Sequence, residues 1–255
     1  MPKFAANLTM MFNEVPFLQR FDAAANAGFT ACEFLFPYEH APHEVATALQ
    51  ASGMQNVLFN LSPGDWSKGE RGLAGLPGRE AEFRDSVATA IAYAQALGTQ
   101  RLHAMSGIRA EGVTHEDYVA TVVPNLRYAC DQLAPHGITL LIEPINTRDM
   151  PGYLLSLQAD AHDLLARVGR PNLKVQMDFY HVQIMEGDVA TKFRHWQKDI
   201  GHIQIASVPA RHEPDEGELN YRWLFKLLDE LGYDGWVGCE YRPRAGTLDG
   251  LAWMR

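Results

Sequence analysis

The stretch Ile138-Thr-Leu-Leu-Ile-Glu143 is a short apolar run that ends in a carboxylate. A segment of helical periodicity follows, Gln158 to Val168, and then a second run of the same kind, Leu173-Lys-Val-Gln-Met-Asp178. Strand, helix and strand in this order form a βα unit, which places its two strands parallel in one sheet. This stretch therefore predicts a parallel sheet with carboxylates at its carboxyl edge.

The same alternation extends in both directions along the whole chain. The expected strands are Lys3–Leu8, Ala31–Phe36, Gln55–Phe59, Arg101–Ala104, Ile138–Glu143, Leu173–Asp178, His202–Ala206 and Trp236–Glu240. The expected helices are Pro16–Ala27, Pro42–Ser52, Arg79–Leu97, His115–Pro135, Gln158–Val168, Asp188–Asp199 and Glu218–Leu231. Glycine marks the end of several of them, as in Ser52-Gly53 and Leu97-Gly98, because it adopts the left-handed cap that other residues resist.

The spacing of the strands indicates how the sheet closes. Seven steps separate Lys3 from Trp236, at about 33 residues each, which is the size of a βα unit. Eight such units close most economically into a (β/α)8 TIM barrel, whose usual length is about 250 residues. An open doubly wound sheet is the alternative. No linker or change of composition divides the chain, so we expect one α/β domain over residues 1–255.

Composition and charge exclude several classes of function. The chain has 31 acidic and 22 basic residues and a formal net charge of −9, which argues against a general nucleic-acid binder. The longest apolar runs are too short to cross a membrane, and no secretory signal is visible at the start, so we expect a cytosolic protein. Cys32, Cys130 and Cys239 are too scattered for a disulfide framework or a zinc site and are expected to be buried free thiols.

Four of the expected strands end in residues that an apolar core would not select: Glu143, Asp178, Gln204 and Glu240. Side chains alternate along a strand, so these four face the barrel interior if their apolar neighbours face the helices. Three carboxylates at one end of a barrel repel one another unless a cation lies among them. Oxygen ligands suit Mg²⁺ or Mn²⁺ better than zinc, so we expect a divalent metal site.

Two histidines and two long loops are further candidates for the site. His181 lies three residues after Asp178 in an expected loop, and His103 lies near the end of the fourth strand, whereas the histidines in helical patterns, including His162, are expected to be solvated. The segments 60–78 and 207–217 are longer than a βα connection needs, which is typical of functional loops. The first carries Arg71 and is expected to form a lid over the barrel mouth, and the second carries Arg211. Neither matches a phosphate-binding glycine motif, so no organic cofactor is expected.

Several longer motifs carry a family resemblance. They are Ala5-Ala-Asn-Leu, Glu33-Phe-Leu-Phe-Pro-Tyr38, Pro63-Gly-Asp-Trp, Gly69-Glu-Arg-Gly, Leu76-Pro-Gly-Arg-Glu80, Leu141-Ile-Glu-Pro-Ile-Asn146, Arg211-His-Glu-Pro-Asp, Asn220-Tyr221 and Gly235-Trp-Val-Gly-Cys-Glu-Tyr241. Together they resemble the hydroxypyruvate isomerase family of xylose-isomerase-like TIM barrels, with the closely related 2-oxo-tetronate isomerases. The resemblance runs from the first strand to Trp253.

The resemblance implies roles for individual residues. Glu143, Asp178, Gln204 and Glu240 fall at the family's metal ligands, and Glu143 and Glu240 also fall at its acid/base pair. His181 and Arg211 match residues that contact substrate. Sugar epimerases of the wider superfamily usually have histidine at the position of Gln204, which weakens an epimerase interpretation. Barrels of this superfamily commonly associate, so a homo-oligomer is an open expectation.

We therefore expect a metal-dependent isomerase of a small acid, which converts hydroxypyruvate to 2-hydroxy-3-oxopropanoate through an enediolate. A 2-oxo-tetronate isomerase is the first alternative and a ketose 3-epimerase the second. The substrate carboxylate would meet Arg211 or the lid residue Arg71. An endonuclease for abasic DNA would need extra histidine ligands and a basic groove, and an intact acid/base pair argues against a non-catalytic binding protein.

Overall fold

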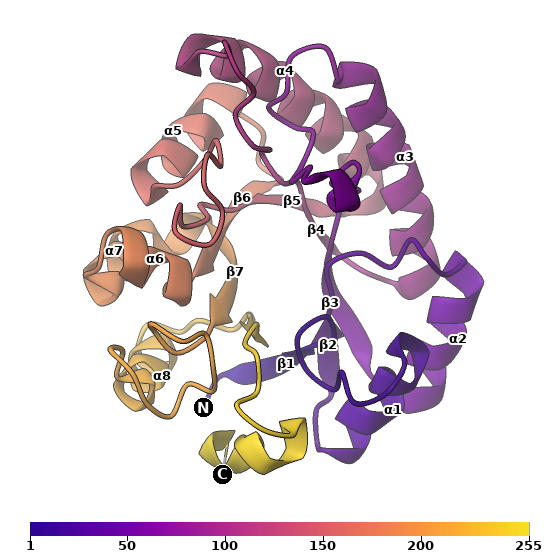
Figure 1. Ribbon diagram of the computed structural model, residues 1–255, viewed down its shortest axis with the longest axis vertical. Coiled ribbons are helices and arrows are strands. Elements are labelled where there is room, and N and C mark those ends of the chain that lie inside the picture. Colours follow the sequence, from indigo (N-terminus) through magenta and orange to yellow (C-terminus); the bar gives the residue numbers. More distant parts are fainter. Residues whose placement is uncertain (255) are drawn as a thin grey trace.

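Eight parallel strands form a closed barrel in the order β1 to β8 in the computed structural model, which describes residues 1–254 (Figure 1). The strands are β1 (Lys3–Asn7), β2 (Ala31–Glu33), β3 (Gln55–Asn60), β4 (Arg101–His103), β5 (Thr139–Ile142), β6 (Leu173–Asp178), β7 (Ile200–Ile205) and β8 (Trp236–Cys239). The seam is closed by β1 and β8, where Phe4 pairs with Val237. The predicted TIM barrel is thus confirmed, and the open doubly wound sheet is wrong.

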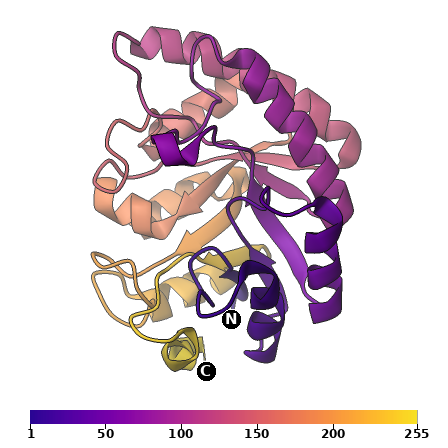
Figure 2. The ribbon, with the colours of Figure 1, turned by 45° about the vertical axis from the view of Figure 1, so that its right-hand side comes forward.

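Helices surround the barrel as an outer ring (Figures 1 and 2). The α-helices are α1 (Phe17–Asn26), α2 (Pro42–Ser52), α3 (Glu80–Leu97), α4 (His115–Leu133), α5 (Gln158–Val168), α6 (Phe179–Met185), α7 (Val189–Trp196) and α8 (Tyr221–Glu230). The short 3₁₀ helices are η1 (Trp66–Lys68), η2 (Ala134–His136), η3 (Gln197–Asp199) and η4 (Thr247–Met254). No helix of the described residues is long and apolar enough to span a membrane.

Three helices were not expected from the sequence: η1, which lies in the segment expected as a lid, α6 and η4. The Asp178 side chain accepts a hydrogen bond from the backbone N–H of Tyr180 (2.8 Å), so α6 begins directly after β6 and His181 lies on a helix instead of in a loop. At the other end of the chain, η4 lies beside α8 and places the Trp253 ring against Phe4 (ring centroids 5.0 Å apart) and Phe225. It packs against β1 and takes the place of the α-helix that would otherwise follow β8.

Apolar side chains form two layers of unequal size. The larger lies between strands and helices and includes Leu140, Val175 and Ile203. The smaller lies inside the barrel and consists of Ala5, Ala31, Val57, Leu58 and Leu141. Since side chains alternate along each strand, the inward positions nearer the carboxyl ends are the ones left for polar residues. The three cysteines are free and buried, as predicted.

Candidate active site

A ring of polar side chains occupies the carboxyl end of the barrel, and each strand contributes one. In strand order they are Asn7, Glu33, Asn60, His103, Glu143, Asp178, Gln204 and Glu240. All eight are buried. All except Asp178 line a cavity of about 530 Å³. In TIM barrels this end is the one that carries the active site.

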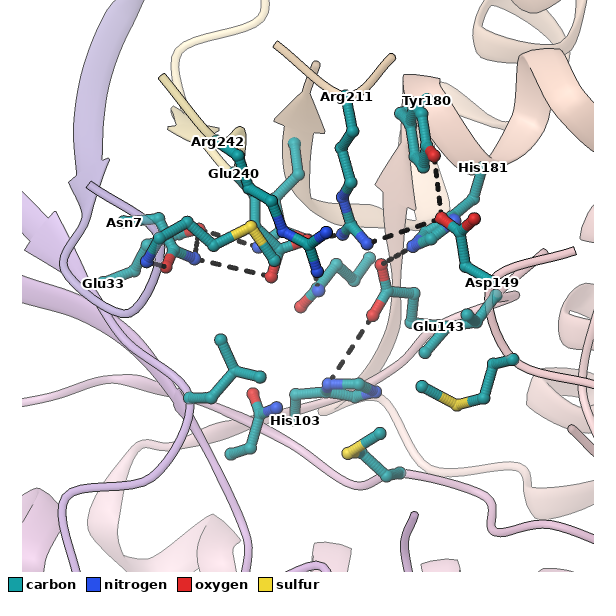
Figure 3. Close-up of a pocket in the computed structure, with 18 of the residues that line it drawn as sticks. Asn7, Glu33, His103, Glu143, Asp149, Tyr180, His181, Arg211, Glu240 and Arg242 are labelled. Carbon is teal, nitrogen blue, oxygen red and sulfur yellow. Dashed lines mark hydrogen bonds and ion pairs between the residues drawn. The ribbon is translucent and has the colours of Figure 1, made fainter. Parts of the chain in front are cut away.

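Glu143, Asp178 and His181 lie close together, and the first and last of them line this cavity (Figure 3). The His181 Nε2 lies 3.5 Å from Asp178 Oδ2 and 3.9 Å from Glu143 Oε1. Both of these carboxylate oxygens are buried without a hydrogen-bond partner among the described residues. Burial raises the pKa of Glu143 well above its usual value, helped by the nearby carboxylates, and burial also raises the pKa of Asp178 to about 6.

His103 lies on the opposite side of Glu143, with its Nδ1 3.7 Å from Glu143 Oε2. That distance is too long for a hydrogen bond, and neither ring nitrogen has a partner within residues 1–254. Burial, with a smaller contribution from His202, lowers the pKa of His103 to about 3, so the ring is neutral near pH 7. His103 is therefore a neutral group in the cavity wall.

Glu240 is paired with Arg211, which lies on the loop after β7. The Arg211 Nη2 is 2.5 Å from Glu240 Oε2 and 3.9 Å from Asp178 Oδ2. Burial nevertheless raises the pKa of Glu240 to about 8. Arg211 has a positive φ of 59°, which is unusual for a residue with a Cβ and is typical of functional sites. The backbone therefore holds this guanidinium among the carboxylates at some conformational expense.

Gln204 is oriented by a buried network, most of whose members line the cavity. Its Nε2 donates to Glu33 Oε1 (2.7 Å), and its Oε1 accepts from Gln176 Nε2 (2.6 Å). Glu33 also accepts hydrogen bonds from Asn7 Nδ2 (2.9 Å) and His202 Nε2 (2.6 Å). Because a carboxylate can only accept here, Glu33 fixes which end of the Gln204 amide is the oxygen.

A second network lies on the loop between β5 and α5. Tyr180 Oη donates to Asp149 Oδ2 (2.7 Å), and Arg148 Nη2 donates to Tyr180 Oη (3.1 Å). The fully buried Asn146 contacts both Asp149 and His181. Burial would raise the pKa of Asp149, but hydrogen bonds from Tyr180 and Asn146, together with the charges of two nearby arginines, outweigh it and lower that pKa. Asp149 is therefore ionised and accepts hydrogen bonds.

The segment 60–78 forms part of the cavity wall through Trp66 and Arg71. The Arg71 guanidinium stacks on the Trp66 ring at 3.7 Å and donates to the Trp66 carbonyl oxygen (3.0 Å). The loop is anchored by the ion pair between Glu70 and Arg79 (2.8 Å). The segment thus borders the cavity, as expected for a lid, and the contacts of Arg71 and Glu70 hold it in place.

Two loops are joined beside Glu240. The Arg242 N–H donates to the Arg211 carbonyl oxygen (2.8 Å), and the Arg242 carbonyl oxygen lies 2.7 Å from His212 Nδ1. Arg244 then binds the buried carboxylate of Glu213 (3.0 Å). These contacts fix the segment 207–217 against the residues after β8. They also place the Arg211 and Arg242 side chains next to each other at the cavity (Figure 3).

The oxygen-rich end of the barrel fits a divalent metal ion. Glu143 Oε1 and Asp178 Oδ2 are buried carboxylate oxygens without partners among the described residues, which is unfavourable unless a cation approaches them. Gln204 lines the same cavity, and its amide oxygen is held by the hydrogen bond from Gln176. Oxygen donors of this kind are those of Mg²⁺ and Mn²⁺ sites.

Several residues of this site were not expected from the sequence. Glu33 was missed because its strand was expected to continue to Phe36, which made a strand-end carboxylate look like a mid-strand residue. Asn146, Asp149 and Tyr180 come together only through the packing of α6 on the β5–α5 loop. His162 was expected to be solvated, but its ring stacks on Trp196 and is half-buried.

Comparison with known proteins agrees with this fold. Residues 21–255 match the family model for the xylose isomerase-like TIM barrel. A 2-oxo-tetronate isomerase from Cupriavidus necator is 57% identical to this chain, covering 100% of it and 98% of the relative. A hydroxypyruvate isomerase from Escherichia coli is 48% identical, covering 100% of this chain and 98% of the relative.

A solved structure is also similar over the full length. It is described as an AP endonuclease of family 2 from Brucella melitensis, with 56% identity, a TM-score of 0.98, and coverage of 100% of this chain and 98% of that one. The family match and the full-length similarity to named isomerases lead to one conclusion. The chain belongs to the xylose isomerase-like TIM barrel family and is an isomerase of the group that includes the hydroxypyruvate and 2-oxo-tetronate isomerases.

Proposed function

We propose that this isomerase moves a carbonyl group between neighbouring carbons of a small 2-oxo acid through an enediolate, with Glu143 and Glu240 as the acid/base pair. The observation that carries the proposal is the arc of Glu143, Asp178, Gln204 and Glu240 along four successive strands of the barrel. Glu143 and Glu240 stand at the two ends of this arc. A substrate bound between them would have one glutamate side chain near each of two adjacent carbons.

The proton transfers require no redox cofactor. One carboxylate removes the proton from the hydroxyl-bearing C3, and the electron pair forms the C2–C3 double bond of the enediolate. The proton of the C3 hydroxyl group passes to the oxygen on C2. The other glutamate, protonated, then delivers a proton to C2, which takes up the electron pair of the double bond as the carbonyl group forms at C3. Burial raises the pKa of both Glu143 and Glu240, which makes each a stronger base and allows either to carry the proton.

The same arc would hold a divalent cation. Glu143, Asp178 and Glu240 would contribute carboxylate oxygens and Gln204 its amide oxygen, with Mg²⁺ or Mn²⁺ as the ions best suited to such ligands. When bound, the ion supplies Lewis-acid stabilisation of the negative charge on the enediolate. Glu33 contributes by keeping the Gln204 oxygen pointed away from its own carboxylate.

The cationic side chains around the cavity support an acidic substrate. Arg71, Arg148, Arg211 and Arg242 all line it. The first three already contact the Trp66 carbonyl oxygen, the Tyr180 hydroxyl group and the Glu240 carboxylate, respectively. Within residues 1–254 the Arg242 guanidinium has no such partner, so we assign the substrate carboxylate to Arg242, with the lid residue Arg71 as the second candidate.

Two acids fit this chemistry. Hydroxypyruvate would give 2-hydroxy-3-oxopropanoate, and 2-oxo-tetronate would give its 3-oxo isomer by the same steps with one further CH₂OH group. The higher identity to a 2-oxo-tetronate isomerase (57%) than to a hydroxypyruvate isomerase (48%) favours the four-carbon acid. A cavity of about 530 Å³ has room for the extra carbon.

The test is a substrate panel with Glu143→Gln and Glu240→Gln variants. The wild type with Mg²⁺ or Mn²⁺ should isomerise 2-oxo-tetronate with the highest kcat/KM, hydroxypyruvate next and neutral ketoses least. Each variant should lose a factor of about 10²–10⁴ in kcat while keeping its circular dichroism spectrum, because one proton transfer then lacks its carboxylate. Near-normal activity in both variants would overturn the roles of the glutamates. Cleavage of an abasic oligonucleotide without isomerisation would overturn the function.

A further inference from the structure

Asn146 is buried, and the hydrogen bonds of its side-chain amide distinguish the oxygen from the nitrogen. The backbone N–H of Asp149 donates to its Oδ1 (2.7 Å), and its Nδ2 lies 3.2 Å from the Asp149 carboxylate. A backbone N–H can only donate, and an ionised carboxylate can only accept. The amide must therefore present its oxygen to the backbone and its NH₂ group to the carboxylate.

The oriented amide determines the state of the neighbouring imidazole. Asn146 Nδ2 also lies 2.6 Å from His181 Nδ1, and the Asn146 backbone N–H approaches the same nitrogen at 3.4 Å. Both groups of Asn146 are donors, so His181 Nδ1 must be the acceptor and cannot carry hydrogen. The ring is then neutral, and its single N–H is at Nε2.

That N–H points to the reacting end of the cavity. His181 Nε2 faces Asp178 Oδ2 (3.5 Å) and Glu143 Oε1 (3.9 Å), and the ring lines the cavity (Figure 3). A protonated nitrogen has no lone pair for a metal ion. Glu143, Asp178 and His181 are close enough together to resemble a three-ligand site. The hydrogen on Nε2 removes His181 from that set and makes it a hydrogen-bond donor.

We propose that Asn146, held by Asp149, is a positioning residue that keeps His181 in the Nε2–H tautomer, so that His181 donates to a substrate oxygen instead of binding metal. Tyr180 and Arg148 extend the same chain of contacts, since Tyr180 donates to Asp149 (2.7 Å) and Arg148 donates to Tyr180 (3.1 Å). The assignment of the tautomer is independent of the reaction. The donation to substrate rests on the proposed function.

The decisive variant exchanges the two side chains, Asn146→Asp with Asp149→Asn. The exchange keeps the composition and net charge of the loop. The new amide at position 149 would donate to the new carboxylate at position 146, and that carboxylate would present an acceptor to His181 Nδ1. The hydrogen should then move to Nδ1. Asp149→Asn alone is the matched control: the backbone N–H of residue 149 still fixes the Asn146 amide, so the wild-type tautomer should persist.

The readout is the ¹⁵N spectrum of the histidine rings in the full-length protein, recorded after chelation and again with Mg²⁺. His181→Gln identifies the His181 signals. In the wild type and the control, Nε2 should show the N–H type of shift and Nδ1 the unprotonated type, with and without Mg²⁺. The exchange variant should show the reverse. A wild-type N–H at Nδ1, loss of the Nε2 hydrogen on adding Mg²⁺, or an unchanged spectrum in a folded exchange variant would overturn the proposal.

Turnover provides a second measurement. Removing one positioned donor to a developing oxyanion typically lowers kcat by about 10²–10³, and the exchange variant should show a loss of this order with a smaller change in KM. A reversed tautomer with unchanged kcat would overturn the catalytic part alone. A wild type that isomerises none of the 2-oxo acids would overturn the proposed function and leave the tautomer to be decided by the spectrum.

Discussion

Arg242 differs from the other arginines of the cavity in its surroundings. Its backbone is fixed to the neighbouring loop by the contacts with Arg211 and His212, while its guanidinium has no protein partner within residues 1–254. A fixed backbone with an uncommitted guanidinium is suited to recognise an anion that arrives from solution, because no existing ion pair has to break.

Arg242→Gln should therefore raise KM for a 2-oxo acid by about 10–100-fold with little change in kcat, since a hydrogen bond to a charged group contributes about 1.5–3 kcal/mol. Arg109→Gln removes the same charge from a residue outside the cavity wall and should leave KM unchanged. Steady-state kinetics on both variants checks this. A normal KM in Arg242→Gln together with a raised KM in Arg71→Gln would assign the carboxylate to Arg71.

At the scale of one residue, the sequence predicts where the polar side chains at the ends of strands lie. Glu143, Asp178, Gln204 and Glu240 all lie at the carboxyl end of the barrel because alternation along a strand is a local property. Asp178 shows that one residue can have two roles: its Oδ1 caps α6, and its Oδ2 has no hydrogen-bond partner among the described residues. Asn146 could not be predicted, because its role arises from contacts with residues on other elements.

At the scale of elements, the lid depends on a close approach of backbone to backbone. Gly72 has a φ of 120°, and a Cβ on it would lie 2.2 Å from the Met105 carbonyl oxygen. Alanine at this position must therefore move the segment that carries Arg71 away from the β4 side of the cavity. The sequence indicates that this loop is long, but not which of its glycines fixes it.

Gly72→Ala should lower kcat/KM by about tenfold or more by displacing Arg71. Gly78→Ala is the matched control, because Gly78 also has a positive φ of 82°, but a Cβ added there would meet no described atom within 4 Å. Both variants share the backbone strain of about 1–2 kcal/mol, and only the first has the collision. Thermal unfolding and kinetics separate the two effects; equal kcat/KM in both variants would argue against a positioned lid.

The contact between α5 and α7 predicts a pH dependence of stability. The His162 ring stacks on Trp196 at 4.6 Å, and burial lowers the pKa of His162 to about 4, with smaller effects of Asp199, His195 and Lys174. The unfolded chain protonates near the ordinary histidine pKa of about 6.5, so it binds more protons than the folded protein between about pH 6.5 and 4. The contribution of His162 to stability should therefore fall as pH falls through this range.

Urea unfolding at pH 7 and pH 5 measures this effect. On going from pH 7 to pH 5, the free energy of unfolding of the wild type should decrease relative to that of His162→Phe, which keeps an aromatic ring against Trp196. His136→Phe replaces an exposed histidine of η2 and should leave the pH dependence as in the wild type. Equal slopes in the wild type and His162→Phe would exclude His162 as the source.

At the scale of the whole molecule, the acidic residues that give the net charge of −9 differ in how far they are buried. Most acidic side chains are at least partly exposed to solvent, but Glu33, Glu143, Asp178 and Glu240 are buried together at one end of the barrel. Among the described residues Arg211 is the guanidinium that contacts this group directly. The barrel was predictable because its eight units repeat one local pattern, whereas the balance of charge inside it depends on how the finished barrel brings those strand ends together.

This concentration of buried carboxylates means that a divalent cation should stabilise the whole fold. A ligand that binds only the folded state at 100 times its Kd adds about 2.7 kcal/mol, and for a chain of this size that corresponds to about 5–10 °C in Tm. We expect Mg²⁺ or Mn²⁺ to raise the Tm of chelated protein by this amount, while KCl at the same ionic strength changes it little. Asp178→Asn keeps a side chain that can cap α6 but removes one carboxylate, so its shift should be much smaller. Scanning calorimetry measures these shifts. An equal shift in Asp178→Asn, or an equal shift of the wild type with KCl, would mean that the cation acts on the surface charge and not on the strand-end carboxylates.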